Sequence, residues 1–230
     1  MMFKNLRRSS FAIATLATAV GVALASPAYA TIVTNGSDII YNVSQPVTGT
    51  NLTATIEFSD FLFISGGGNT TVTFTTDVAN TTQQGSLSAS DFQSIRLTGF
   101  GYDTDPNTTG ASDNSSVYNS FLSATFPSFN TVDVCLSSGQ LACAGGGNGG
   151  LTPGQTDSFT ETLTFSGTIT SFDFGIGPNE QLATKWQTAF GSFETGTDPG
   201  TPGTVPEPAS LALLGSALLG FGILRYRKRA

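Results

Sequence analysis

The sequence contains no histidine and few charged residues, and both deficits limit its chemistry. Lys and Arg number 9 and Asp and Glu 16, so charged side chains make up 11% of the chain and the formal charge is −7. The lack of histidine excludes Ser/His/Asp and Cys/His catalysis and histidine metal ligation. Between residues 31 and 205 only Arg96 and Lys185 are basic, against fifteen acidic residues, which gives this segment a charge of −13. We expect no nucleic-acid partner, because binding to phosphates depends on clustered Lys and Arg.

The first thirty residues have the pattern of a secretory signal peptide. Basic residues at positions 4, 7 and 8 precede an uncharged apolar run over 11–25. Ala28 and Ala30 then supply the small residues that signal peptidase needs at −3 and −1. We therefore expect a signal helix that is removed by signal peptidase before Thr31. An uncleaved membrane anchor is the alternative, and it is disfavoured because the run is short and ends at Pro27.

The C-terminus combines a proline-containing motif, an apolar run and a basic end, in that order. The motif is Pro206, Glu207 and Pro208, and an uncharged run follows over 211–224. The chain then ends in a basic cluster, which consists of Arg225, Arg227, Lys228 and Arg229. As a helix, residues 209–224 would be about 24 Å long, which is short for a membrane core of about 30 Å. The basic cluster would stay on the cytoplasmic side.

These three features resemble the PEP-CTERM sorting signal of Gram-negative bacteria, including cyanobacteria. The resemblance covers residues 205–230. It implies transient insertion into the inner membrane and processing by an exosortase, a membrane transpeptidase. It also implies export to the cell surface or to the extracellular polysaccharide matrix, as in a biofilm. A plain transmembrane anchor that is never cut is the alternative.

The exported middle of the chain is predicted to be all-β. Residues 31–205 include 32 Thr, a β-branched residue that suits strands with one solvated face. Apolar and polar residues alternate with the period of a strand in five segments, 52–58, 71–75, 131–136, 159–165 and 172–176. Turn-rich segments separate them, at 66–69, 105–107, 145–150 and 177–179. We predict an antiparallel, jelly-roll-like β-sandwich of roughly eight to ten strands, with one helical turn within 90–97.

These patterns divide the chain into four segments. Residues 1–30 are the signal peptide and 31–193 the exported β-sandwich domain. Residues 194–205 are rich in Pro, Gly and Thr and have no apolar periodicity, so we expect a disordered spacer. Residues 206–230 form the sorting signal with its hydrophobic helix.

Cys135 and Cys143 are the two cysteines of the sequence. In an oxidising compartment such a pair forms a disulfide, which would stabilise the fold by about 2 to 3 kcal/mol. A catalytic thiol is disfavoured, because there is no histidine and we expect any Lys or Arg to be distant. Together with the segments 99–103 and 145–147, the pair also resembles the cistern family of PEP-CTERM proteins, which implies no known activity.

The segment around residue 105 contains alternating oxygen ligands of the kind that begin a calcium loop. The candidate ligands of this weak Ca²⁺ site are Asp103, Asp105, Asn107 and Asp113. The EF-hand pattern fails, because Thr108 replaces its invariant Gly and Asn114 its bidentate acid. A solvated turn is the alternative, and we expect no other cofactor.

Carboxylate pairs and aromatic residues are the remaining candidates for chemistry on glycans. The glutamates of this segment are Glu57, Glu161, Glu180 and Glu194, and their spacing selects no catalytic pair. We expect Glu57 and Glu161 to point to water or to a sheet edge. Trp186 and the five tyrosines could stack on sugars, although a single Trp near Phe190 and Phe193 more often packs in a core or at an edge.

The sequence thus predicts a non-enzymatic exported protein with a structural or adhesive role in the envelope or exopolysaccharide. Its expected partners are signal peptidase, an exosortase, the inner membrane during export, and extracellular polysaccharide. A carbohydrate- or calcium-binding surface module is the first alternative. A glycan-active enzyme is the second, and it would need two carboxyl groups in one cleft.

Overall fold

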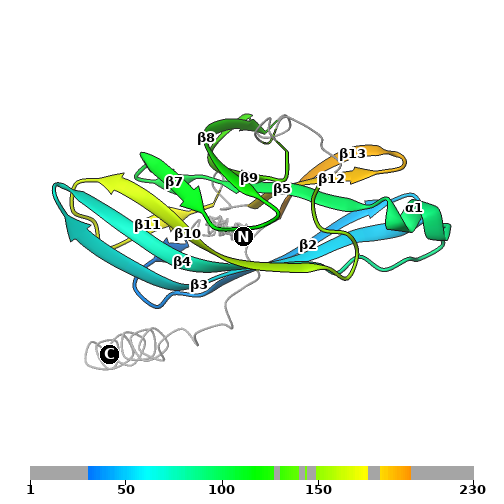
Figure 1. Cartoon of the computed structure of the whole chain (residues 1–230), viewed down its shortest axis with the longest axis horizontal. Coiled ribbons are helices and arrows are strands. Elements are labelled where there is room, and N and C mark those ends of the chain that lie inside the picture. The colour runs from blue at the N-terminus through cyan, green and yellow to red at the C-terminus, as the bar shows by residue number, and fades with distance from the viewer. Residues whose placement is uncertain (1–30, 127–129, 140–142, 144–148, 176–181, 198–230) are drawn as a thin grey trace, which may run out of the picture.

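The computed structural model describes residues 31–126, 130–139, 143, 149–175 and 182–197 (Figure 1). Within these ranges nearly all regular structure is β-strand, which confirms the all-β prediction. In chain order the strands are β1 (Ile32–Val33), β2 (Ile39–Val47), β3 (Thr50–Gly66), β4 (Asn69–Asn80), β5 (Arg96–Tyr102), β6 (Thr104–Asp105), β7 (Gly110–Asp113), β8 (Asn119–Phe126), β9 (Asn130–Ser137), β10 (Thr156–Ser166), β11 (Phe172–Phe174), β12 (Leu182–Thr188) and β13 (Gly191–Thr197).

The strands form three antiparallel sheets. Sheet 1 has the order β2-β3-β4-β10-β7, and sheet 2 has the order β13-β12-β5-β9-β8. Figure 1 shows these two sheets as the layers of a sandwich, while β1, β11 and β6 form the small sheet 3. The consecutive strands β2, β3 and β4 form a meander, which departs from the double Greek key of a jelly roll. The predicted strand number was too low, because β1, β6 and β7 have only two to four residues and show no alternation.

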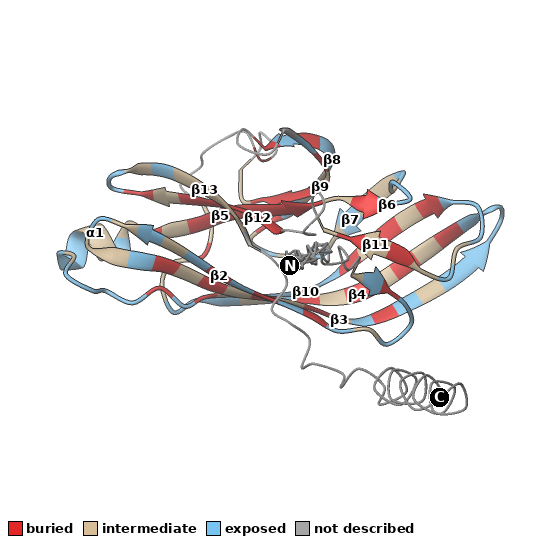
Figure 2. Ribbon diagram, turned by 180° about the vertical axis from the view of Figure 1, so that it is seen from behind, coloured by how far each residue is buried: buried red, intermediate tan, exposed pale blue. Residues whose placement is uncertain are grey.

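The core lies between the two large sheets, and the predicted alternation places residues in it. Along β3, Leu52, Ala54, Ile56 and Phe58 are buried, while the residues between them are partly exposed (Figure 2). Strand β11 of sheet 3 adds Phe174, whose ring stacks on that of Tyr102 with centroids 4.2 Å apart. Aromatic rings therefore contribute much of the apolar area buried in the sandwich.

Two local features set which residues of β3 face the core. A bulge at Asp60, whose φ is +58°, shifts the register between Ser59 and Leu62. Beyond the bulge Leu62 and Ile64 are exposed, with 49% and 56% of their surface accessible. The strand then turns into β4 through Gly67 and Gly68, which both have positive φ, as a two-residue type I′ hairpin requires.

The predicted helical turn before β5 is present as α1 (Ala89–Gln93). Ser88 is its N-cap, and the Ser88 hydroxyl accepts a hydrogen bond from the backbone N–H of Asp91. Ser94 is the C-cap of α1, and β5 begins two residues later. A capped turn thus carries the chain from sheet 1 to sheet 2.

The C-terminal boundary of the sandwich lies further along the chain than expected. Strand β13 continues to Thr197 and pairs with β12 there, so residues 194–197 belong to a strand and not to the predicted spacer. The rest of the spacer, the predicted signal helix and the predicted sorting helix lie outside the described residues. Over the ranges that the structure describes, no helix has the length and apolar character needed to cross a membrane.

Candidate functional site

Two glycines of β5 allow other segments to cover the outer face of sheet 2. A side chain at Gly99 would place its Cβ 2.8 Å from the carbonyl oxygen of Leu136. A side chain at Gly101 would place its Cβ 3.0 Å from Cγ2 of Val132. The first approach is too close for any side chain and the second is tighter than most Cβ contacts, so the glycines permit tight packing of β9 and the segment around Cys143. This packing explains the glycines of the segment 99–103.

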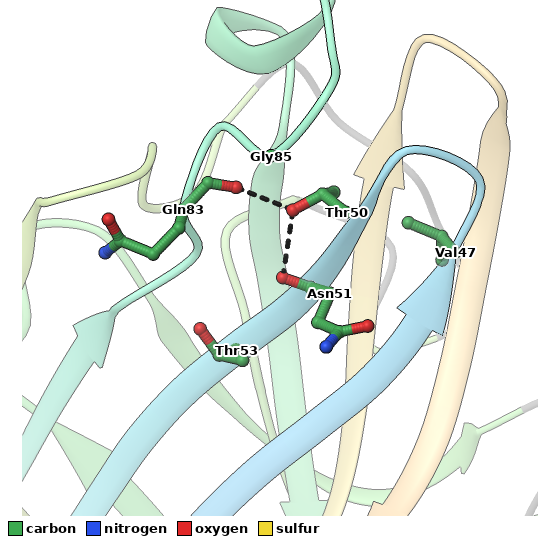
Figure 3. Close-up of a pocket in the computed structure, with 6 residues that line it drawn as sticks. All are labelled: Val47, Thr50, Asn51, Thr53, Gln83 and Gly85. Carbon is green, nitrogen blue, oxygen red and sulfur yellow. Dashed lines mark hydrogen bonds between the residues drawn. The ribbon is translucent and has the colours of Figure 1, made fainter.

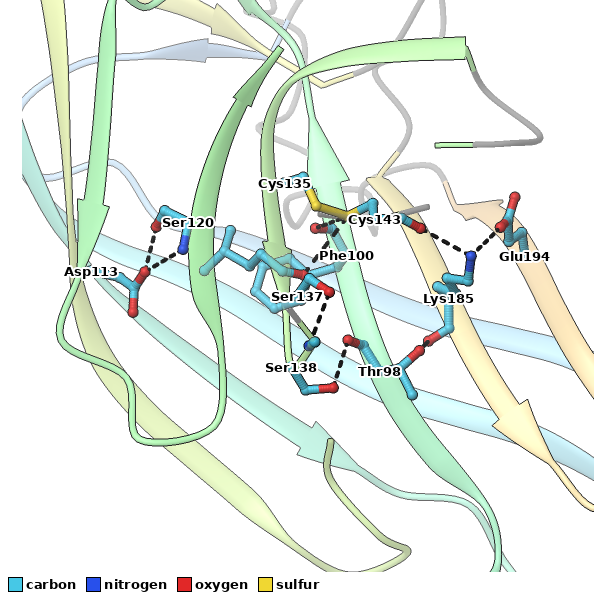
Figure 4. The surroundings of a disulfide bond; sticks show 12 residues. Thr98, Phe100, Asp113, Ser120, Cys135, Ser137, Ser138, Cys143, Lys185 and Glu194 are labelled. Carbon is cyan, nitrogen blue, oxygen red and sulfur yellow. Dashed lines mark hydrogen bonds and ion pairs between the residues drawn. A yellow bond between two sulfur atoms is a disulfide. The ribbon is translucent and has the colours of Figure 1, made fainter. Parts of the chain in front are cut away.

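The disulfide between Cys135 and Cys143 is present, as predicted (Figure 4). Its Cα atoms lie 6.0 Å apart. Both cysteines are buried in a small apolar cluster with Phe126, Val132 and Ala183. The bridge therefore closes a second core on the outer face of sheet 2, separate from the core between the sheets.

A buried ion pair lies beside the disulfide, contrary to the expectation that any Lys or Arg would be distant from the cysteines. The Lys185 ammonium is 3.1 Å from Oε1 of Glu194 and donates a hydrogen bond of 3.0 Å to the carbonyl oxygen of Cys143 (Figure 4). The two charged side chains are only 7% and 9% exposed. Because the cysteines are bonded to each other, this lysine orders the Cys143 segment and activates no thiol.

Glu161 lies inside the sandwich, so the expectation that it points to water or a sheet edge was wrong. Its side chain is on the inner face of β10 and is 1% exposed. Thr76 of β4 donates a hydrogen bond of 2.5 Å to Oε1, and Tyr102 of β5 donates one of 2.7 Å to Oε2. The carboxyl group thus links sheet 1 to sheet 2.

Burial shifts the pKa values of Glu161 and Tyr102. Loss of hydration raises the pKa of Glu161 to about 7, against the opposing effect of the two hydrogen bonds, and the charge of Asp113 adds to the increase. Burial, with the adjacent Glu161, also raises the pKa of Tyr102 well above its usual value. Glu161 therefore titrates near neutral pH in the folded protein. It is sealed in the core, where a substrate has no access.

The loop at the predicted calcium site uses its oxygens for internal hydrogen bonds. Oδ1 of Asp103 accepts a bond from the backbone N–H of Asp133. In return, Oδ1 of Asp133 accepts a bond from the Asn107 amide. Asp105 is exposed on β6. This arrangement ties the loop between β6 and β7 to β9.

The fourth predicted ligand belongs to a different set of contacts. Asp113 in β7 accepts hydrogen bonds from the backbone N–H and the hydroxyl of Ser120, at 2.6 and 2.5 Å (Figure 4). Throughout the described part of the chain, no three His, Cys, Asp or Glu side chains come together in a way that could hold a metal ion. The structure thus does not bring the predicted calcium ligands together into a site.

The described surface has two notable pockets. One, of about 500 Å³, lies beside the turn between β2 and β3 (Figure 3). No charged side chain lines it, and the Thr50 hydroxyl is already bonded to the carbonyl oxygen of Gln83. The other, of about 340 Å³, lies over β3, β4 and β10 and contains Glu57, Asp77 and Asp157. Glu57 and Asp77 are partners across neighbouring strands, and both lie on the outer face of sheet 1.

The aromatic residues that could stack on a sugar are in the core. Trp186 is fully buried opposite Phe193, as the core interpretation predicted. Tyr41, Tyr102 and Tyr118 are also buried, so no Trp or Tyr ring is exposed among the described residues. Sugar recognition by stacking on these rings is therefore excluded in this conformation.

Sequence comparison identifies the C-terminal signal. Residues 204–228 match the family model of the PEP-CTERM protein-sorting motif, so the chain carries this motif. The match contains Pro206, Glu207 and Pro208, and it implies an exported protein that an exosortase sorts at the membrane. The comparison does not confirm the cistern family. No curated protein and no solved structure matches the chain.

Proposed function

We propose that the protein is a non-enzymatic structural or adhesive component of the cell surface or of the extracellular polysaccharide matrix. The observation that carries this proposal is the sorting motif at 204–228, which follows an all-β domain closed by a disulfide. A disulfide suits an oxidising location outside the cytoplasm. The acidic, Thr-rich exterior suits a domain that remains hydrated among other macromolecules.

The distribution of ionisable groups supports a non-enzymatic role. The sequence has no histidine, and the glutamate with a raised pKa is closed inside the sandwich. The larger pocket has no charged lining residue, so it lacks a general acid or base. The acidic pocket holds Glu57 and Asp77 side by side on the open outer face of sheet 1, and no basic side chain lines it.

Sorting is tested by changing the motif. We expect Pro206→Ala with Pro208→Ala to block processing, so that intact-mass measurement finds residues 225–229 still attached and the chain stays in the inner membrane. The matched control is Pro199→Ala with Pro202→Ala, which removes two prolines from the preceding segment and leaves the motif intact. Equal processing of both variants, or retention of the basic end in the unaltered protein, would contradict sorting through this motif.

The structural or adhesive role is tested separately, in cells that lack the protein. We expect such cells to shed more extracellular polysaccharide and to attach less to surfaces. Restoring the unaltered gene reverses both defects, and so does Glu57→Gln, which removes a carboxylate from the acidic pocket. Release of sugar fragments by the purified protein, abolished in Glu57→Gln, would instead establish a glycan-active enzyme. A rise in melting temperature at millimolar Ca²⁺ would establish a calcium-binding module.

A further inference from the structure

Six threonines form a regular array on the outer face of sheet 1. They are arranged in three cross-strand pairs between β4 and β10, namely Thr71 with Thr164, Thr73 with Thr162 and Thr75 with Thr160. Alternate residues of these strands, among them Val72, Phe74 and Leu163, are buried in the core. Because side chains alternate between the faces of a strand, all six threonines point away from the core. We call them the Thr array.

The Thr array repeats in two directions. Neighbouring strands lie about 5 Å apart, and residues two apart along a strand lie about 7 Å apart. Threonine is β-branched, so its χ1 angle is restricted and its hydroxyl and methyl groups hold their positions. The array covers only two strands, so it includes a single step of sheet twist. The distance between the strands and the distance between alternate residues along a strand are both close to spacings between water oxygens on the prism face of hexagonal ice.

The six hydroxyl groups have no protein partner. Within the described part of the structure, none of them donates or accepts a hydrogen bond. Other threonines behave differently, because Thr76 bonds to Glu161 and the Thr70 hydroxyl bonds to the carbonyl oxygen of Gly167. Each hydroxyl of the array can therefore donate to and accept from water.

The Thr array is bordered by two apolar residues on the β3 side and by Ser112 and Gly110 on the β7 side. Leu62 and Ile64 of β3 lie opposite Thr73 and Thr71, and both are exposed. Beyond Thr75, the next pair of β3 and β4 on the outer face is Glu57 with Asp77, so charged side chains border one end of the array and none lies between its threonines. Displacing the water that covers exposed methyl and alkyl groups lowers the free energy.

We propose that the Thr array is an ice-binding site. An ice surface offers a fixed lattice of donors and acceptors at the two repeats of the array, and the apolar groups between the hydroxyls fit into the gaps of that lattice. A glycan-binding face would instead present aromatic rings, and this face has none among its described residues. The site depends on sheet 1 alone and is independent of how the protein is retained at the cell surface.

The test uses the exported form of the protein purified from its cells. We expect it to inhibit ice recrystallisation, to separate the melting and freezing temperatures, and to become enriched in slowly grown ice. Thr73→Lys with Thr162→Lys places two bulky charges in the middle pair of the array and abolishes all three effects. Thr73→Val with Thr162→Val keeps the side-chain shape and loses only part of the activity.

The matched control is Thr125→Lys with Thr131→Lys, an exposed cross-strand pair on β8 and β9 of sheet 2, which keeps full activity. Circular dichroism and thermal unfolding show whether each variant is folded. Absence of ice activity in the unaltered protein, or equal losses in the two lysine variants, would overturn the proposal. Array-dependent binding to crystalline cellulose without ice activity would assign this face to a glycan, which also overturns it. Sorting is measured separately by cell fractionation, and the lysine variants leave it unchanged.

Discussion

The outer faces of the two large sheets differ in how far they are exposed to solvent. Sheet 1 leaves its outer face open to solvent, and its strands alternate between buried apolar and accessible polar residues. The central strands of sheet 2 are covered on both sides: in β12 the residues from Leu182 to Trp186 are all buried, while the edge strand β8 keeps exposed residues. The difference arises because glycines of β5 admit close packing of the disulfide-linked segment over sheet 2. Alternation of apolar and polar residues along a strand therefore indicates a sheet with one solvent-exposed face. A strand covered on both faces, such as β12, lacks this alternation and can contain a buried charged residue such as Lys185.

The Lys185–Glu194 pair gives the strongest test of this difference. Lys185→Ala removes the ammonium that neutralises the buried Glu194 carboxylate, so we expect the free energy of unfolding to fall by about 3 to 5 kcal/mol. Chemical denaturation at neutral pH measures the loss. The control is Thr75→Ala on the open face of sheet 1, where a substitution changes stability by only about 0.5 kcal/mol or less. A small loss for Lys185→Ala would show that the outer side of sheet 2 is hydrated like that of sheet 1.

The pH dependence of stability tests whether Glu161, on the inner face of sheet 1, is closed off from water. Its pKa in the folded protein is about 7, above the usual 4.5, so the folded state holds the proton more strongly than the unfolded state. The resulting contribution to stability is complete below pH 4.5 and is lost as the pH rises through 7, by about 3 kcal/mol in total. Unfolding experiments at pH 5 and pH 8 measure this loss.

The matched control for the pH experiment is Glu161→Gln, which keeps the size of the side chain and removes its titration. We expect its stability to change less between pH 5 and pH 8 than that of the unaltered protein, and the difference reports on Glu161 alone. Identical pH dependence of the two proteins would mean that the carboxyl group is hydrated and that the core between the sheets is open.

The disulfide is expected to have the smallest of these three effects. Cys135→Ser with Cys143→Ser opens a short loop, which costs about 2 to 3 kcal/mol through the entropy of the unfolded chain. The loss is measured against the unaltered oxidised protein, and reducing agent should destabilise the latter by a similar amount. We expect faster hydrogen exchange in β5 and β9 of sheet 2, with the meander of sheet 1 unchanged. A uniform increase over both sheets would show that the covering segment supports the whole sandwich.

Local patterns in the sequence predicted much of this fold. The alternation over 52–58 and 71–75 identified β3 and β4, because both strands have one wet face. The disulfide was also predictable, because the sequence has two cysteines and both lie in the segment that is expected to be exported. The spacer boundary was misplaced, since β13 has the Gly and Thr content of a linker and is a strand only through its pairing with β12.

The wrong expectations for Glu161 and Lys185 have the same cause. Glu161 bonds to Thr76 and Tyr102, which are 85 and 59 residues away in the sequence, and no local signal marks such partners. A glutamate between two threonines in an alternating strand looks exposed until the register of the strand is known. Lys185 was likewise placed far from the cysteines, because its contact with Cys143 crosses 42 residues.

The sequence by itself determined the sorting motif, the cysteine pairing, the strand character of the middle segment and its excess of acidic residues. Each of these depends on residue types at short spacing along the chain, so neighbouring positions carry the whole signal. Only the tertiary structure decided which carboxylate is buried, which lysine is paired, and which threonines align into an array on an open face. These properties depend on strand register and layer packing, which join residues that are distant in the sequence.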